Sequence, residues 1–370
     1  MNDLKKQLIA ILRAVVCRDG TPVPSGFDPD AMMALAKENH LETIVFEAAP
    51  EVFREKYEGV RLSMLARSAR QAHYLELTEK ALKDAGIHYG LLKGAILKSD
   101  YPEPYLRFMT DMDFYINSES REAIKEAMIS AGSTFTGTES GDDQFIFPGG
   151  IKIEMHGRLL YRKTKGDIEH YPAWKYVDCA SDRLTSEGFA LNIIGHAVYD
   201  LTKGGPGVRY ILDLWVLRHL HSPAPDWDKV YEKLSEDGIY EAAKNLMDLS
   251  EHLFSGAQAQ GVISELADYV LSSGLNGSAR RMTAIELGKS GGRSGAFLRQ
   301  LFRNRAEYEN RYPWLKKHPV LFPVAVFLRI IDSLKTGSHR KRFFRWHRDA
   351  GRAEKAEIEY QKEFQKKLGL

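Results

Sequence analysis

The chain has 370 residues and a formal net charge of +2, with 28% charged and 44% hydrophobic residues. This balance is typical of a globular protein of two or three structural units, and it excludes an overall electrostatic bias toward nucleic acid. No apolar run reaches the about 20 residues of a membrane span. Neither a signal peptide nor a cysteine motif is present, so we expect a cytoplasmic protein.

The N-terminal region, residues 1–84, is predicted to be helical. Asp28 can cap a helix through Ala31–Lys37, because aspartate accepts hydrogen bonds from the first free amides of a helix. A long helix is expected over Val60–Lys83, and Gly86 is a plausible stop for it.

The next region, residues 85–182, alternates between strand and helix patterns. We expect strands over Ile87–Leu92, Met112–Ile116, Thr134–Gly137, Gln144–Phe147 and Ile151–His156, and helices over Ala95–Ser99 and Ser120–Ala131. Pro148-Gly149-Gly150 is predicted to be the turn of a hairpin. This region should form a small α/β unit.

From about Thr185 the pattern is helical again. Helices are expected over Phe189–Leu201, Val208–Leu220, Trp227–Glu236, Ile239–Phe254 and Val262–Leu271. Residues 273–295 are rich in Gly, Ser and Arg, which predicts a loop. We therefore divide the remainder into a helical region 183–295 and a C-terminal region 296–370. The fold class predicted is α+β, a small mixed sheet flanked by N-terminal and C-terminal helical regions.

Three carboxylates in the α/β unit carry the main chemical signal. Asp111 and Asp113 are spaced i, i+2 on a predicted strand and therefore share one face of it. The same alternation places Lys152, Glu154 and His156 on one face of another strand. If the two strands are neighbours, three carboxylates converge, and such oxygen ligands suit divalent cations that assist phosphate chemistry.

The motifs around these acids resemble the nucleotidyltransferase superfamily with the polymerase-β-like fold, and within it a group of uncharacterised nucleotidyltransferases. The matching segments are AGIHYGLLKG, YPEPYLR, TDMDFYI and IEMH, over about 85–158. A less specific resemblance extends over 185–220.

The resemblance implies roles for particular residues. Asp111 and Asp113 would bind metal, and Glu154 would bind metal or act as base for the acceptor hydroxyl. Gly94 would lie at the turn that meets the triphosphate. Ala95 follows it where the superfamily usually has Ser or Gly, so Lys93 or Arg107 would serve as the cationic phosphate clamp.

Four further residues are candidate substrate contacts. His156 could contact phosphate or acceptor, or be a structural histidine. His196, Arg209 and Asp213 could hold base, ribose or acceptor at the rim of the site. Arg209 and Asp213 are spaced i, i+4 on a predicted helix and share one face of it, and a structural ion pair or hydrogen bond between helices is the alternative interpretation.

A basic, aromatic segment follows the apolar run VLFPVAVFLRII. Residues 335–348 contain six Lys and Arg residues and no acid, interleaved with Phe343, Phe344 and Trp346. This pattern is compatible with a helix that packs on the domain, with peripheral contact to an anionic membrane through 320–348, or with an acidic or nucleic-acid partner.

Together these features predict an enzyme that moves a nucleoside monophosphate from an NTP, expected to be ATP, to a hydroxyl or phosphate of an acceptor. Mg²⁺ is the expected cofactor, with Mn²⁺ as the alternative. A phosphotransferase acting on a peptide or metabolite, and a non-catalytic nucleotide-binding module, remain as alternatives. The sequence does not distinguish a small-molecule, peptide, protein or RNA acceptor.

Overall fold

The structure is a computed structural model. It describes residues 3–139, 141–164, 167–274, 277–292, 294–296, 308, 312, 314–335 and 355–370. The chain forms two compact units. The first comprises residues 1–201, 205–276 and 368–370, and the second comprises residues 202–204 and 277–367. The four-part division expected from the sequence stays a prediction.

Four helices open the first unit: α1 (Asp3–Leu12), α2 (Pro29–Glu38), α3 (Glu42–Ala48) and α4 (Pro50–Asp84). Asp28 caps α2 as predicted, because its side chain accepts from the amides of Asp30 and Ala31. The long helix α4 begins well before Val60. Pro50 occupies its first turn, where the missing proline N–H costs nothing, so the helix can start there.

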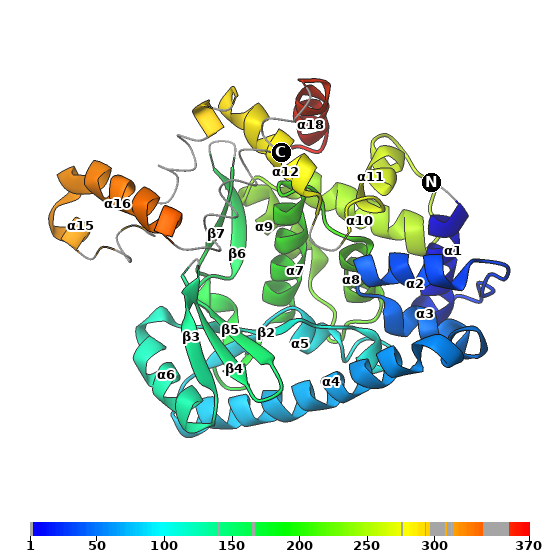
Figure 1. The fold of residues 1–370 in the computed structure, drawn as a ribbon, viewed down its shortest axis with the longest axis horizontal. Helices are drawn as coiled ribbons and strands as arrows, with labels where there is room; N and C mark the ends of the chain where they lie inside the picture. The colour runs from blue at the N-terminus through cyan, green and yellow to red at the C-terminus, as the bar shows by residue number, and fades with distance from the viewer. Residues whose placement is uncertain are drawn as a thin grey trace. The chain divides into compact units, whose positions relative to one another are not determined.

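A five-stranded mixed sheet forms the centre of the first unit (Figure 1). Its order is β1-β2-β5-β4-β3. The strands are β1 (Tyr89–Leu91), β2 (Asp111–Ile116), β3 (Thr134–Glu139), β4 (Asp142–Phe147) and β5 (Ile151–His156). Strands β2 and β5 run parallel, whereas the other neighbouring pairs are antiparallel. The short helix α5 (Gly94–Leu97) follows β1, and α6 (Arg121–Ser130) follows β2.

The two faces of the sheet differ in chemistry, as strand alternation predicts. Met112 and Phe114 of β2 are fully buried in one apolar core with Leu82 of α4 and Ile124 and Met128 of α6. Figure 1 shows α4 running along this side of the sheet. The acidic residues of β2 and β5 therefore lie on the opposite face.

Two small antiparallel pairs were not predicted from the sequence. Strands β6 (Leu160–Thr164) and β7 (Asp167–Tyr171) form one, and β8 (Val177–Asp178) and β9 (Arg183–Leu184) form the other. Their strands are short, so the period-two signal is weak.

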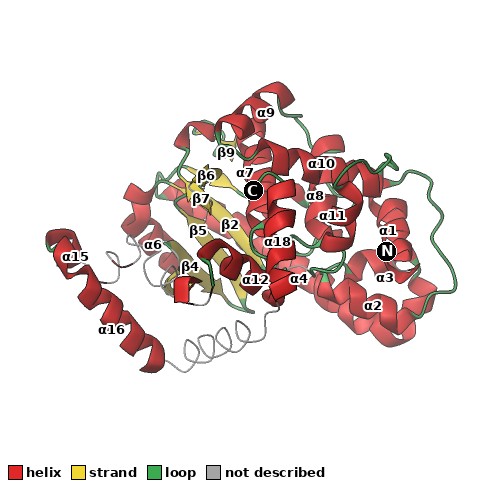
Figure 2. Ribbon diagram, turned by 90° about the horizontal axis from the view of Figure 1, so that it is seen from above, coloured by secondary structure: helices red, strands yellow, loops and turns green. Residues whose placement is uncertain are grey.

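Five helices complete the first unit: α7 (Ser186–Leu201), α8 (Val208–His219), α9 (Trp227–Glu236), α10 (Tyr240–Phe254) and α11 (Ile263–Val270). Their bounds lie close to those predicted. Helix α7 packs on α8, α10 and β6, and Figure 2 shows α7, α8 and α10 gathered beside the strands.

The second unit contains α12 (Ala279–Ser290), α15 (Trp314–Lys317), α16 (Phe322–Lys335) and α18 (Lys355–Lys367). The loop predicted over 273–295 is wrong, because α12 lies within it. Ser278 caps the start of α12 by accepting from the amide of Arg281, and Gly291 ends it with a φ of +68°. These caps outweigh the flexible composition of the flanks.

The expected α+β class is confirmed by the mixed sheet and its helical flanks. No helix in the described ranges is long and apolar enough to cross a membrane. Of the segment 320–348, residues 336–348 lie outside the described residues, so the predicted membrane contact is untested.

Candidate active site

Asp113 and Glu154 lie directly opposite each other on neighbouring parallel strands. Asp113 of β2 is in register with Glu154 of β5, and Asp111 with Lys152. Strands β2 and β5 are therefore neighbours, which the sequence analysis required for the carboxylates of the two strands to come together. Ile151, Ile153 and Met155 are fully buried on the other face of β5, as alternation requires.

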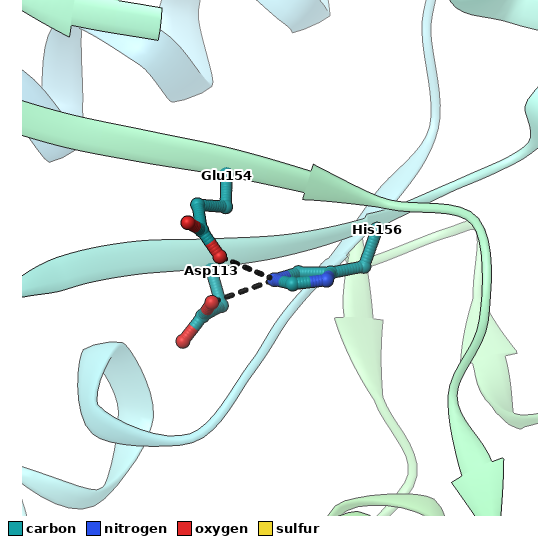
Figure 3. A group of neighbouring side chains, drawn as sticks. All are labelled: Asp113, Glu154 and His156. Atoms are coloured by element: carbon teal, nitrogen blue, oxygen red, sulfur yellow. Dashed lines mark hydrogen bonds and ion pairs between the residues drawn. The ribbon is translucent and has the colours of Figure 1, made fainter. Parts of the chain in front are cut away.

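His156 lies between the carboxylates (Figure 3). Its Nε2 is 2.6 Å from Oδ1 of Asp113 and 3.5 Å from Oε2 of Glu154. Its other nitrogen, Nδ1, is 3.1 Å from Oδ2 of Asp142, a residue of β4 that was not predicted from the sequence. Its place follows only from the register of β4 and β5, in which Gln144 pairs with Glu154, so that Asp142, two residues earlier in β4, lies on the same face.

Hydrogen bonds and nearby charges shift the pKa values of His156 and Asp113 in opposite directions. Burial disfavours the charged ring of His156, but hydrogen bonds to Asp113 and Asp142 raise its pKa to about 9. Burial likewise opposes ionisation of Asp113, yet Lys93 and His156 hold its pKa well below the usual range. At neutral pH the protein therefore presents an ionised carboxylate at Asp113 beside a protonated ring.

Lys93 brings a cation to the same place. Its Nζ lies 3.4 Å from Oδ2 of Asp113, and 22% of its side chain is exposed. Although burial disfavours the charged ammonium, the nearby Asp113 keeps the pKa of Lys93 above its ordinary value. The lysine is thus charged, and part of its side chain is exposed to solvent.

Gly94 is required by close packing. A Cβ at this position would lie 2.3 Å from Nη1 of Arg107 and 2.6 Å from Sδ of Met109. The helix that starts here, α5, has only four residues, so its dipole is small. The positive charge at this turn therefore comes mainly from Lys93.

Arg107 and Asp213 form a buried bidentate ion pair. Nε of Arg107 donates to Oδ1 of Asp213 at 2.9 Å, and Nη2 donates to Oδ2 at 2.7 Å. Their side chains are 5% and 1% exposed, and the hydroxyl of Tyr101 also donates to Oδ1 at 2.7 Å. Asp213 therefore takes part in a buried ion pair with a residue of another element, whereas the sequence had indicated only that it shares a helix face with Arg209.

His196 lies on α7 and Arg209 on the neighbouring helix α8. Nη1 of Arg209 donates to the carbonyl oxygen of Phe108 at 3.0 Å. The ring of His196 stacks on Tyr210 with centroids 5.6 Å apart, and Nδ1 lies 3.3 Å from Asp200. His196 is close enough to Asp113 to lower its pKa.

Helix α4 fixes the segment that leads into β2, which sequence reasoning did not foresee. Arg67 donates through Nε to the carbonyl oxygen of Met109 at 3.2 Å and through Nη2 to that of Thr110 at 2.7 Å. Gln71 also donates to the carbonyl oxygen of Met109, at 2.9 Å. The sequence does not indicate these contacts, because Arg67 and Gln71 lie in α4, far along the chain from Met109 and Thr110.

The donor atoms of Asp113, Glu154 and His156 fit a divalent cation. One ligand atom from each lies within 4.8 Å of the others. An octahedral ion with bonds of about 2.1 Å has adjacent ligands about 3 Å apart, and the two separations at Nε2, 2.6 and 3.5 Å, bracket that value. Asp111 is not a member of this group; its Oδ1 accepts from the hydroxyl of Thr110 at 3.0 Å.

A mixed sheet that brings acidic side chains together from two neighbouring parallel strands is compatible with the nucleotidyltransferase class expected from the motifs. A family model described as uncharacterised nucleotidyltransferase matches residues 25–255. Because this match covers more than half of the chain, the protein belongs to that family and carries its nucleotidyltransferase domain. The match extends well beyond the segment 85–158 on which the resemblance was most specific. Searches of curated proteins and of solved structures found no match.

Proposed function

We propose that this protein transfers a nucleoside monophosphate from an NTP to a hydroxyl or phosphate of an acceptor and releases pyrophosphate. The observation that carries the proposal is the pairing of Asp113 with Glu154 on parallel strands, with the ammonium of Lys93 3.4 Å from Asp113. The family match supports the same class of reaction. From the sequence we expect ATP as the donor and a cytoplasmic location.

Asp113 and Glu154, with Asp111 on the same strand face as Asp113, are the proposed holders of Mg²⁺ or Mn²⁺. When bound, such an ion supplies charge stabilisation to the phosphate oxygens that become more negative during transfer. The carboxylate of Asp113 is ionised at neutral pH, which is the form that a metal requires.

Lys93 is the proposed cationic partner of the triphosphate, and Gly94 allows the chain to pass close to Arg107. Because Arg107 forms a bidentate pair with Asp213 and is nearly inaccessible, the geometry favours a positioning role for this pair over direct phosphate contact. Arg209 and His196 remain candidates for acceptor or nucleoside contact.

The proposed chemical step is a substitution at the α-phosphorus. A bond forms between the acceptor oxygen and this phosphorus, the bond to the bridging oxygen of the β-phosphate breaks, and pyrophosphate leaves. The hydroxyl proton passes to a nearby carboxylate, for which Glu154 is the proposed base. Lys152 forms an ion pair with Oε1 of Glu154 and Gln144 donates to the same oxygen at 3.4 Å, which orients the carboxylate.

The experiment that tests this proposal is metal-dependent pyrophosphate release from ATP by the full chain. We expect release to fall at least about a hundredfold in Asp113→Asn, the size of loss that follows removal of a group that stabilises developing charge. Asp143→Asn is the matched control, because Asp143 lies in β4 with its Oδ1 hydrogen-bonded to Thr138 at 2.6 Å, away from His156. Unchanged release in Asp113→Asn would remove the catalytic assignment.

Two other outcomes correspond to the alternatives left by the sequence. Release of ADP with transfer of the γ-phosphate would indicate a phosphotransferase that uses the same residues. Failure to bind metal–NTP at millimolar concentration would indicate a module without catalysis.

A further inference from the structure

Asp142 contacts His156, which lies beside Asp113 and Glu154. Neither the motifs nor the proposed reaction provides a role for Asp142. It begins β4, and its Oδ2 lies 3.1 Å from Nδ1 of His156. The side chain is only 15% exposed. Its second oxygen, Oδ1, is buried and has no hydrogen-bond partner among the described residues.

The register of the hairpin explains why Asp142 reaches His156. Gln144 is opposite Glu154 in the β4–β5 pair, so the side chain two residues earlier in β4 shares that face and continues toward His156. The next residue, Asp143, points to the other face. There it accepts from Thr138 at 2.6 Å and lies 3.5 Å from Nη1 of Arg121.

The ring of His156 is thereby held at both nitrogens. Nδ1 faces Asp142, while Nε2 points at Oδ1 of Asp113 and Oε2 of Glu154 at 2.6 and 3.5 Å. A histidine that binds a metal through one nitrogen almost always donates from the other to a carboxylate or carbonyl, which fixes the tautomer and the ring orientation. Asp142, His156 and the two acids provide this arrangement when a metal replaces the proton that Nε2 shares with Asp113.

We propose that His156 is a metal ligand through Nε2, that Asp142 is its positioning residue, and that the site consequently prefers a divalent first-row transition ion to Mg²⁺. The inference rests on the proposed function for the presence of a metal at Asp113 and Glu154. Mg²⁺ takes oxygen ligands almost exclusively, whereas imidazole is a ligand suited to transition ions. A donor set of two carboxylates and one imidazole therefore shifts selectivity away from Mg²⁺.

The competing explanation is that His156 only bridges Asp113 and Asp142 as a charged structural link. In that case the ring would stay outside the coordination sphere, and any bound ion would have oxygen ligands alone. The two explanations predict different spectra for bound Mn²⁺: a coupling to a ¹⁴N nucleus is present only if His156 binds the ion. This coupling can be measured without turnover.

The test is pulsed electron paramagnetic resonance of Mn²⁺ added to the full chain without nucleotide. We expect one bound ion whose spectrum carries a coupling to a ¹⁴N nucleus. His156→Asn should abolish this coupling and remove the preference for Mn²⁺ over Mg²⁺ measured by competition. Asp142→Asn should weaken Mn²⁺ binding by about 10-fold to 100-fold, whereas Asp143→Asn should leave it unchanged.

Bound Mn²⁺ without nitrogen coupling in the wild-type protein would overturn the inference, as would equal Mn²⁺ affinities for Asp142→Asn and Asp143→Asn. Either result leaves nucleotidyl transfer standing. Conversely, a nitrogen-coupled ion in a protein that releases no pyrophosphate from any NTP would support the metal site while the proposed function fails. Circular dichroism of each variant confirms that the sheet has formed.

Discussion

The ammonium of Lys93 and the carboxylate of Asp113 lie 3.4 Å apart, which joins the turn after β1 to the acidic strand β2. Lys93 adopts a φ of +43°, a region that residues with a side chain rarely occupy. Such strain costs about 1–3 kcal/mol and tends to persist where the surrounding structure enforces it, often at functional sites. This cation is the partner that we propose for the triphosphate.

Replacing Lys93 with methionine tests this role. We expect kcat/KM for the NTP to fall at least about tenfold, equivalent to about 1.4 kcal/mol of lost transition-state stabilisation, because the charge near the phosphates disappears. The measurement is steady-state pyrophosphate release. Lys98→Met is the matched control, since Lys98 follows α5 directly and donates to Ser68 at 3.0 Å instead of meeting the acids. Equal losses in both variants would contradict the assignment.

The ion pair between Arg107 and Asp213 should act on stability. Arg107→Met leaves the buried carboxylate of Asp213 without its partner, and we expect a loss of about 3–5 kcal/mol in the free energy of unfolding. Urea denaturation measures this loss. The double variant Arg107→Met/Asp213→Leu should recover much of it, because no uncompensated charge remains. A stable Arg107→Met variant with a raised KM for NTP would instead indicate direct phosphate contact.

Gly94→Ala should destabilise the protein by about 1–3 kcal/mol through overpacking, because the new methyl group would lie 2.6 Å from Sδ of Met109. Gly59→Ala provides the contrast. Gly59 lies inside α4, and a methyl group added there would have no neighbouring atom within 4 Å, so alanine should stabilise the helix by up to about 1 kcal/mol. Thermal unfolding of both variants would reveal the opposite signs, and a neutral Gly94→Ala would refute the packing argument.

The stability of the protein should depend on pH through His40. Its ring stacks on Phe108 at 4.7 Å, and burial, together with Arg209 and Arg67, lowers its pKa to about 4. The unfolded chain binds a proton here near pH 6.5 while the folded chain does not, so this contribution to stability is lost as pH falls from about 6.5 to 4.

The variant His40→Asn isolates that contribution, and asparagine tolerates the φ of +54° at this position. At pH 7.5 the variant should be less stable than the wild type, because it lacks the stacked ring. The difference in free energy of unfolding should shrink as the pH is lowered toward 4. A difference that stays constant over this range would show that His40 is not buried in its neutral form.

Strand alternation predicted the most local part of the site correctly. The period of two placed Asp113 with Asp111, and Glu154 with His156, on single faces without any knowledge of neighbours. Partner choice over long distances was not predictable. Asp213 pairs with Arg107 and not with Arg209, because α8 packs against the segment before β2. This packing cannot be predicted from local sequence patterns.

The ends of helices and strands were likewise predictable only where they depend on residues close by in the sequence. Asp28 and Gly86 act as predicted because capping depends on a few adjacent residues. The loop expected over 273–295 is wrong, because Ser278 and Gly291 cap α12 within a segment of otherwise flexible composition. Asp142 was missed because its role appears only when the register of β4 and β5 is known.

The most direct test of the account is the fate of label from ATP. Purified protein with Mn²⁺ or Mg²⁺ and fractions of a cell lysate is supplied with ATP labelled at the α-phosphate or at the γ-phosphate, alongside Asp113→Asn. The account predicts that α-label enters an acceptor, that γ-label appears as pyrophosphate, and that the variant transfers neither. Transfer of γ-label to the acceptor, or α-label transfer undiminished in Asp113→Asn, would contradict it.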